Sequence, residues 1–200
     1  ARELQKVTYH VRAKRGALLF ARCWLLVEGE TEFTMLPELA RALGHDFDLA
    51  GVCCVEFAQS GLKPLIKTAQ DLGIEWHLLA DGDRAGKDYA STANDLLSGS
   101  LAAERITSIV EPDIEHCLWH GGYKYVYEAA VDNNHKAMVK SAPGSAQYPT
   151  ETIDAAIKST SKPHLSYAII AEAAKAGSLG VPATLKTGIE AAIKLAGRLA

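Results

Sequence analysis

The sequence lacks a long hydrophobic run, a recognisable signal-peptide core and a paired cysteine motif. No apolar stretch in its 200 residues approaches the roughly 18 residues that a membrane-spanning helix needs, so we expect no membrane partner. The first residues contain no signal-peptide core, which predicts a cytoplasmic protein. They also contain no initiator methionine, and the chain therefore reads as a fragment of a larger protein.

Basic charge is also missing. The formal net charge is −3, whereas a nucleic-acid-binding domain usually carries a basic footprint. A nucleic-acid partner would therefore need metal ions, or a few clustered lysines and arginines, to hold its phosphates. The four cysteines form no C-x-x-C pair, which argues against a zinc site and predicts reduced, buried thiols. With 48% apolar and 22% charged residues, the composition is that of an ordinary globular domain.

What is present is an alternation of short apolar runs and amphipathic segments. The apolar runs predict strands at 23–27, 51–58, 74–80 and 105–111. The segments between them predict helices at 31–44, 63–73 and 86–98. This order indicates an α/β fold, a parallel sheet covered by helices on both faces. After about residue 112 the pattern predicts helices alone, at 121–140, 152–160, 164–177 and 182–197.

Carboxylates follow three of the predicted strands at the point where each strand ends. Ligands of parallel α/β sheets bind at the carboxyl ends of the strands, so these acids are expected to share one crevice. The acids are Glu28 and Glu32, Asp81 and Asp83, and Glu111, Asp113 and Glu115. One such cluster alone fits solvated loops and helix caps equally well, but three at one edge favour a cation site. Hard ions such as Mg²⁺ or Mn²⁺ prefer oxygen ligands, and this many carboxylates predict two ions about 4 Å apart.

Glycines shape the first two clusters. Gly29 permits a tight turn after Glu28, and Thr31 is expected to cap the following helix, with Pro37 causing a kink or a late start. Gly82 is expected to permit a close backbone approach or a positive φ. In the third cluster an acid could instead start a helix, where a carboxylate suits the helix dipole.

The segments "LLVEGETE" and "LLADGDRAG" resemble the Toprim domain, which topoisomerases, primases and certain nucleases share. The additional segments "VEPDIEH" and "SKPH" resemble the OLD (overcoming lysogenization defect) family, in which a Toprim nuclease follows an ABC-type ATPase. The resemblance covers about residues 16–175. It implies a Toprim-like core over 21–120. The residue pattern predicts a helical connection before it, over 1–20, and a helical subdomain after it, over 121–200, that packs on the core.

The resemblance also implies a function, the metal-dependent nicking or cleavage of DNA. Carried over residue by residue, it gives catalytic and metal-binding roles to Glu28, Glu32, Asp81 and Asp83, and metal-binding roles to Glu111 and Asp113. Lys162 falls where the family has a lysine near the scissile phosphate. The chain has no Walker lysine, so an ATPase domain would lie N-terminally in the parent protein. An oligomer of the parent protein would form through that N-terminal part.

Further contacts to DNA are expected from basic and hydroxyl residues near the second strand. Ser60 follows that strand and could touch a phosphate or a metal-bound water, and Lys63 is a candidate contact to the DNA backbone. A basic cluster at Arg12, Lys14 and Arg15 is a second candidate. His116 and His120 are spaced as a metal pair would be, but without a third ligand they are expected to be structural or exposed.

Two other classes of function remain open at this point. A phosphatase of the haloacid-dehalogenase type also uses Asp-x-Asp, but there the pair ends the first strand, whereas Asp81 and Asp83 follow the third. A non-catalytic docking module could also carry an acid pocket on a parallel sheet, and it would bind metal without turnover. The third acidic segment and Lys162 argue against it.

Overall fold

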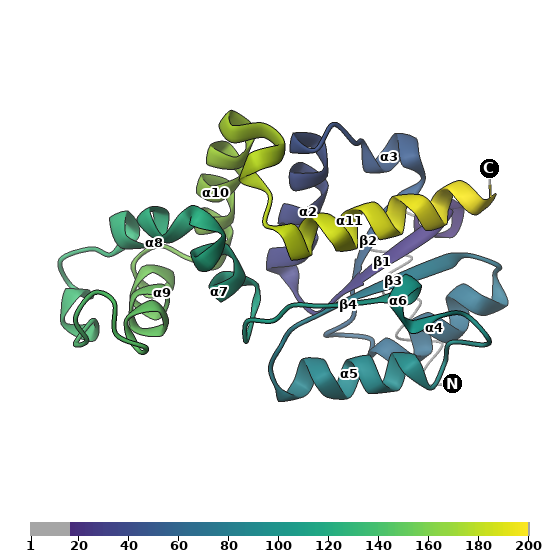
Figure 1. The fold of residues 1–200 in the computed structure, drawn as a ribbon, viewed down its shortest axis with the longest axis horizontal. Coiled ribbons are helices and arrows are strands. Elements are labelled where there is room, and N and C mark those ends of the chain that lie inside the picture. The colour runs from purple at the N-terminus through teal and green to yellow at the C-terminus, as the bar shows by residue number, and fades with distance from the viewer. Residues whose placement is uncertain (1–16, 200) are drawn as a thin grey trace.

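The computed structural model describes residues 17–199 (Figure 1). Most of the predicted helical connection over 1–20, including Arg12, Lys14 and Arg15, lies outside the described residues. Its last part, Ala17–Phe20, is a 3-10 turn that leads into the first strand.

Four parallel strands form the sheet, in the order β2-β1-β3-β4. Each predicted strand is found, with bounds Cys23–Val27 (β1), Val52–Glu56 (β2), Glu75–Ala80 (β3) and Ile106–Ser108 (β4). The last strand ends earlier than expected, because the chain turns toward Gly82, whose N–H donates to the carbonyl of Glu111. The expected parallel α/β sheet is confirmed.

Helices connect the strands and make up the C-terminal part. Those among the strands are Glu30–Ala42 (α2), Phe47–Ala50 (α3), Leu62–Asp71 (α4), Arg84–Asn94 (α5) and Ala102–Arg105 (α6). Those that follow are Ile114–Leu118 (α7), Lys124–Ala130 (α8), Tyr148–Ser159 (α9), Lys162–Ala176 (α10) and Ala183–Ala196 (α11).

Two helix predictions need correction. The helix expected over 121–140 ends at Ala130, because the carboxylate of Asp132 accepts hydrogen bonds from the backbone N–H groups of Asn134 and His135 and holds a turn there. Pro37 does not delay α2, which begins two turns earlier at Glu30.

The alternation of side chains along β1 builds two hydrophobic cores, one on each face of the sheet. Cys23, Leu25 and Val27 point into the core under α2 and α11, while Trp24 and Leu26 point into the core under α4 and α5. All five side chains are fully buried. Helices therefore cover both faces, as expected.

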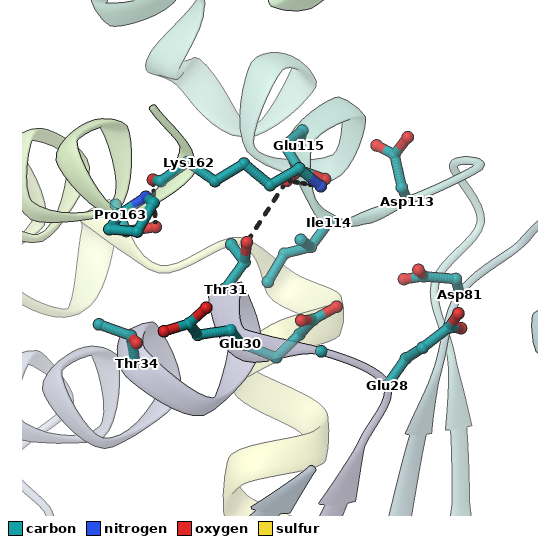
Figure 2. Close-up of a pocket in the computed structure, with 13 residues that line it drawn as sticks. Glu28, Glu30, Thr31, Thr34, Asp81, Asp113, Ile114, Glu115, Lys162 and Pro163 are labelled. Atoms are coloured by element: carbon teal, nitrogen blue, oxygen red, sulfur yellow. Dashed lines mark hydrogen bonds and ion pairs between the residues drawn. The ribbon is translucent and has the colours of Figure 1, made fainter. Parts of the chain in front are cut away.

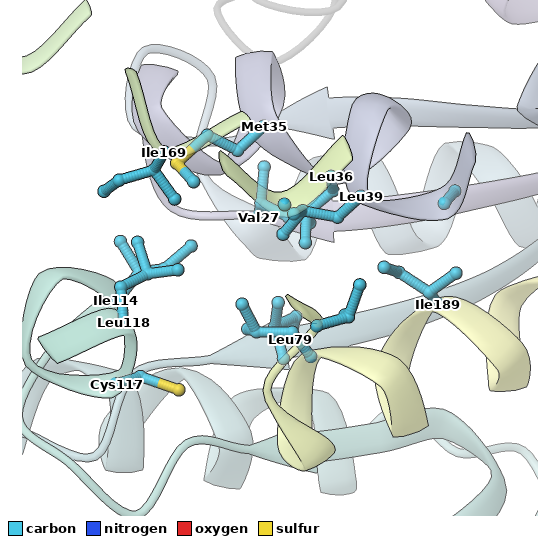
Figure 3. Packing of buried hydrophobic residues seen from close by; sticks show 14 of the residues in the cluster. Val27, Met35, Leu36, Leu39, Leu79, Ile114, Cys117, Leu118, Ile169 and Ile189 are labelled. Carbon is cyan, nitrogen blue, oxygen red and sulfur yellow. The ribbon is translucent and has the colours of Figure 1, made fainter. Parts of the chain in front are cut away.

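The C-terminal helices share the first of these cores. Figure 3 shows Ile189 of α11 near Leu79 of β3, and Ile169 of α10 beside Met35 of α2. The contact of α10 with α2 brings the start of α10 to the sheet edge where β1 ends. The boundaries of the three expected domains stay a prediction.

Candidate active site

A pocket of about 250 Å³ opens where β1 and β3 end, between α2, α7 and α10 (Figure 2). Its charged lining residues are Glu28, Glu30, Glu32, Asp81, Asp113, Glu115 and Lys162. The three strand exits that the sequence singled out thus meet in one place. Figure 2 shows the carboxylates of Glu28, Asp81 and Asp113 on one side of it, and Lys162 joined to Glu115 on the other.

The first exit supplies Glu28 at the end of β1 and Glu32 in the first turn of α2. Gly29, in extended conformation, is the residue that precedes the helix, so the expectation that Thr31 caps it is wrong. Thr31 lies inside α2 instead. Glu32 is only 5% exposed, an unusual place for a carboxylate without a bonded cation.

The second exit depends on Gly82. A Cβ atom there would collide with the backbone carbonyls of Ile109, Val110 and Glu111, so only glycine permits this close approach. The backbone N–H of Gly82 donates to the carbonyl of Glu111 at 3.0 Å. Gly82 was expected to permit either a close backbone approach or a positive φ, and the structure shows the close approach. This contact with the backbone of 109–111 holds Asp81 beside the third acidic segment.

Asp83 has a different position from Asp81. Its carboxylate accepts the N–H of Gly86 at 2.7 Å and caps α5. The side chain of Asp83 is exposed and lies outside the lining of the pocket. Its charge still acts on Glu28: burial raises the pKa of Glu28, and repulsion from Asp83 raises it further.

The third segment places Asp113 and Glu115 in the pocket, whereas Glu111 lies outside its lining. Asp113 caps α7 by accepting the N–H of His116 at 2.8 Å, and its Oδ1 also lies 2.6 Å from Nδ1 of His116. Glu115 is 6% exposed, and its Oε1 lies 2.8 Å from Nζ of Lys162. The hydroxyl of Thr31 donates to the same oxygen at 3.5 Å.

Burial, with the repulsion of neighbouring carboxylates, raises the pKa values of Asp81 and Glu32. Burial, and then repulsion from Glu32 and Glu28, raises the pKa of Asp81 to about 8. Burial, with repulsion from Glu115 and Glu28, raises the pKa of Glu32 to about 7. Without a cation these two groups therefore hold protons near neutral pH, since like charges in one low-dielectric site cannot all ionise.

Lys162 is the one cationic side chain that lines this pocket within the described part of the chain. It is the first residue of α10, after Ser161, whose hydroxyl accepts the N–H of His164 at 3.3 Å. Burial lowers the pKa of Lys162, but the hydrogen bond and charge of Glu115 outweigh it, so the pKa lies above its usual range. Lys162 is therefore an ammonium at neutral pH.

The donor set fits a hard divalent cation. Six carboxylates line the pocket against one ammonium, and their repulsion is unrelieved by other cations in the lining. Oxygen-only ligands suit Mg²⁺ or Mn²⁺. Across residues 17–199, no three acid, histidine or cysteine side chains already lie close enough together to enclose a metal ion. A cation would therefore draw these side chains inward.

Other residues singled out in the sequence lie elsewhere. Ser60 is fully buried and Lys63 is exposed on α4, and neither lines the pocket, so their predicted contacts with DNA stay predictions. His116 is bonded to Asp113 on one side and to the hydroxyl of Thr150 on the other, at 2.9 Å from Nε2. It is structural, while His120 is exposed.

Two polar residues of the pocket make contacts that the sequence did not predict. Thr31 was expected to cap a helix and Glu115 to be one of the acids at the cation site, but they lie in hydrogen-bonding contact with each other, and Glu115 pairs with Lys162. Spacing along "VEPDIEH" could have favoured Glu115, because residues 113–116 begin a helix and turn residue 115 toward its interior side. Its partner Lys162, however, is 47 residues away, and no local pattern connects the two.

Comparison with known proteins places this site in context. Residues 19–83 match the family model described as "Overcoming lysogenization defect protein-like, TOPRIM domain". The chain is 43% identical over 184 residues to the uncharacterized protein YbjD of Escherichia coli strain K12. The match covers 91% of this chain but 32% of YbjD, so the chain spans about a third of that relative's length.

Solved structures share the fold. The C-terminal region of the OLD protein of Xanthomonas campestris pv. campestris matches with a TM-score of 0.67 and 17% identity, over 92% of this chain and 98% of that one. The C-terminal region of the Burkholderia pseudomallei OLD protein matches with a TM-score of 0.66 and 17% identity, over 88% and 99%. Among the described residues, no helix is long and apolar enough to cross a membrane.

Proposed function

We propose that the chain is a metal-dependent endodeoxyribonuclease, from the premise that residues 19–83 match the OLD-like TOPRIM family model. The observation that carries the proposal is the convergence of carboxylates from three strand exits on one pocket that also holds Lys162. A phosphodiester is an anion, so acids alone would repel it. Cations bound to the acids, together with the ammonium, would attract it.

The chain's own residues divide into two groups. Four carboxylates of the pocket would hold divalent ions: Glu28, Glu32, Asp81 and Asp113. Asp83 and Glu111 lie outside the lining and would join them by turning inward. Two bound Mg²⁺ or Mn²⁺ ions would supply Lewis acidity to the attacking water and to the leaving oxygen. Binding of these ions would displace the protons that Glu32 and Asp81 otherwise retain.

Lys162 forms the second group. Its ammonium is held by Glu115 at the rim opposite Glu28 and Asp81, as Figure 2 shows. There it would donate hydrogen bonds to the nonbridging oxygens of the phosphate and stabilise the charge that develops on them. Because Glu115 fixes the ammonium before substrate arrives, little reorganisation is needed during the reaction.

We extend the proposal to the longer protein of which this chain would be a part. The structural relatives are C-terminal regions of OLD proteins, and the curated relative is about three times as long as the match. An N-terminal ABC-type ATPase domain would precede the nuclease and supply contacts for an oligomer. DNA is the proposed substrate, and Ser60 and Lys63 are kept as candidate contacts.

The test is conversion of supercoiled plasmid to nicked and linear forms by the chain with Mg²⁺, Mn²⁺ or EDTA. Asp81→Asn should abolish cleavage, because it removes one central carboxylate at constant volume. The matched control is Asp88→Asn, an exposed position on α5 outside the pocket, and it should cleave like the wild type.

The same preparations distinguish the other functions. Hydrolysis of p-nitrophenyl phosphate without plasmid cleavage would instead indicate a phosphatase. Metal binding by a folded chain with neither activity would indicate a docking module. Equal cleavage by wild type and Asp81→Asn would show that the pocket is not the active site.

A further inference from the structure

A second pocket of about 520 Å³ lies on the other side of α7. Its volume is within the range of about 300–1,000 Å³ that is usual for small-ligand sites. Lining residues with polar or aromatic groups are His116, Trp119, His120, Lys124, Ser145, Tyr148 and Thr150. No carboxylate is among the residues that line it, in contrast to the acid pocket.

The two pockets share a wall. Asp113 lines the acid pocket, and His116, bonded to Asp113, lines the second one. On its far side His116 is bonded to Thr150, which also lines the second pocket. A chain molecule with one phosphate in the acid pocket would therefore place a neighbouring phosphate near the second pocket, across Asp113 and His116.

The charge of the second pocket comes from Lys124. Its Nζ lies 5.8 Å from the ring centroid of Trp119 and 5.5 Å from that of Tyr148, so two aromatic faces hold the ammonium over the pocket. Its carboxylate neighbour, Glu128, is 3.5 Å away, and the lysine side chain is 46% exposed. Glu128 also accepts the hydroxyl of Tyr148 at 2.7 Å. Lys124 is thus held by the two rings and by a partly exposed ion pair, which solvent screens.

The hydrogen-bonding groups of the pocket are incompletely used. Within residues 17–199, the hydroxyl oxygen of Ser145 is buried and has no hydrogen-bond partner. A buried hydroxyl without a partner costs free energy that a ligand acceptor would recover. Trp119 and His120 lie in the kinked segment Trp119–Tyr123, where Gly122 has φ = 108° and separates α7 from α8.

We propose that this second pocket binds the backbone phosphate of a nucleotide that flanks the scissile bond, with Lys124 as its cation and Ser145 as a donor. The proposal rests on the nuclease function and extends it. It also explains how a chain of net charge −3 could hold DNA, since the substrate would contact a pocket that no carboxylate lines, beside the metal-binding acids.

The experiment measures the binding of fluorescein-labelled DNA by anisotropy, with Ca²⁺ in place of Mg²⁺, over a series of salt concentrations. Lys124→Ala should weaken binding about fivefold or more at low salt and lower the salt slope by about one. Lys124→Arg keeps the cation and should bind within about twofold of the wild type. Thermal unfolding of each variant checks that the fold is retained.

Lys186 provides a matched control. It is 45% exposed and pairs with Glu190 four residues on, as Lys124 pairs with Glu128, but it lies on α11 and outside both pockets. Lys186→Ala should keep the affinity and the salt slope. A methylphosphonate scan gives the second test. Neutralising one phosphate beside the cleavage position should weaken wild-type binding but have no further effect on Lys124→Ala.

Each outcome decides the proposal. Equal affinity and slope for Lys124→Ala and the wild type, or equal losses for Lys124→Ala and Lys186→Ala, would overturn the phosphate subsite. Wild-type chain that binds no DNA would overturn it as well. The nuclease function fails separately, through absence of plasmid cleavage, so an intact nuclease with no role for Lys124 is a distinguishable result.

Discussion

Asp81 and Glu32 are held where their charged forms are least favourable. Their pKa values rise to about 8 and about 7, because both are buried beside other carboxylates. An acid placed this way weakens the metal-free fold and favours cation binding. Active sites often hold such groups at a cost in stability.

The pH dependence of stability follows from Asp81. Its folded pKa lies above its ordinary value of 3.8, so the native state binds the proton more tightly than the unfolded state does. The free energy of unfolding of the metal-free chain should therefore fall as pH rises from about 4 to about 8. In EDTA at pH 8.5, Asp81→Asn should raise the free energy of unfolding by about 1 kcal/mol or more. For a chain of this size, that corresponds to a rise of about 2–4 °C in the melting temperature.

At pH 5 the same substitution should change the melting temperature much less, because Asp81 is then protonated in the native state. Asp154→Asn, at an exposed position on α9, is the control and should be neutral at both pH values. A loss of stability in Asp81→Asn at pH 8.5 would contradict the assigned electrostatics.

Glu115 is expected to act through Lys162. Lys162→Ala should lower kcat about 10²–10³-fold, as loss of a charge-stabilising donor does. Glu115→Gln keeps the volume but loses the charge that fixes the ammonium, so kcat should fall at least about tenfold with KM little changed. The double variant should be no worse than Lys162→Ala alone, because the two residues form one unit.

Additive losses in kcat would contradict this coupling and would indicate that Glu115 has its own contact with a metal ion. Lys158→Ala, an exposed lysine at the end of α9, is the matched control for charge and should leave kcat unchanged.

At the scale of elements, the turn between β3 and α5 fixes the second acid cluster against the third. Gly82→Ala would force a Cβ against three carbonyl oxygens, so the segment after β4 must move. We expect a loss of about 1–3 kcal/mol in stability and of most cleavage activity. Gly197→Ala, where nothing lies within 4 Å of the added Cβ and φ is −69°, is the control. Thermal unfolding and plasmid cleavage measure both, and a fully active Gly82→Ala would contradict the account.

Elements were the most predictable part of the structure. Apolar runs and helical periodicity located the four strands and most helices, because these depend on local pattern. The turn at Asp132 broke a predicted helix, since a side chain that bonds its own backbone competes with helix formation. Gly29 rather than Thr31 preceded α2, because the turn geometry, not the side-chain hydroxyl, decides where that helix begins.

At the scale of the whole molecule, the site is assembled from distant parts of the chain. The rule that ligands bind at the carboxyl ends of parallel strands predicted that the three acid clusters meet. Glu28, Asp81 and Asp113 do line one pocket. The rule gave no means of ranking acids within a cluster, which depends on packing. The ion pair of Lys162 with Glu115 arises only because α10 packs on α2.

Metal binding should therefore stabilise the whole fold. An ion that binds only the folded chain adds about 2.7 kcal/mol at a concentration 100 times its dissociation constant. Differential scanning calorimetry should show a melting temperature that rises with Mn²⁺ concentration in the wild type. Asp81→Asn should lose most of this rise, whereas Asp88→Asn should keep it. Equal rises in all three proteins would place the ion elsewhere.

The most direct test of the central claim is anomalous diffraction from crystals of the chain grown with Mn²⁺. The account predicts manganese peaks inside the acid pocket, bonded to carboxylate oxygens of residues such as Glu28, Asp81 and Asp113, with Lys162 facing them. Peaks only at other surface acids, with this pocket free of manganese at a saturating concentration, would contradict it.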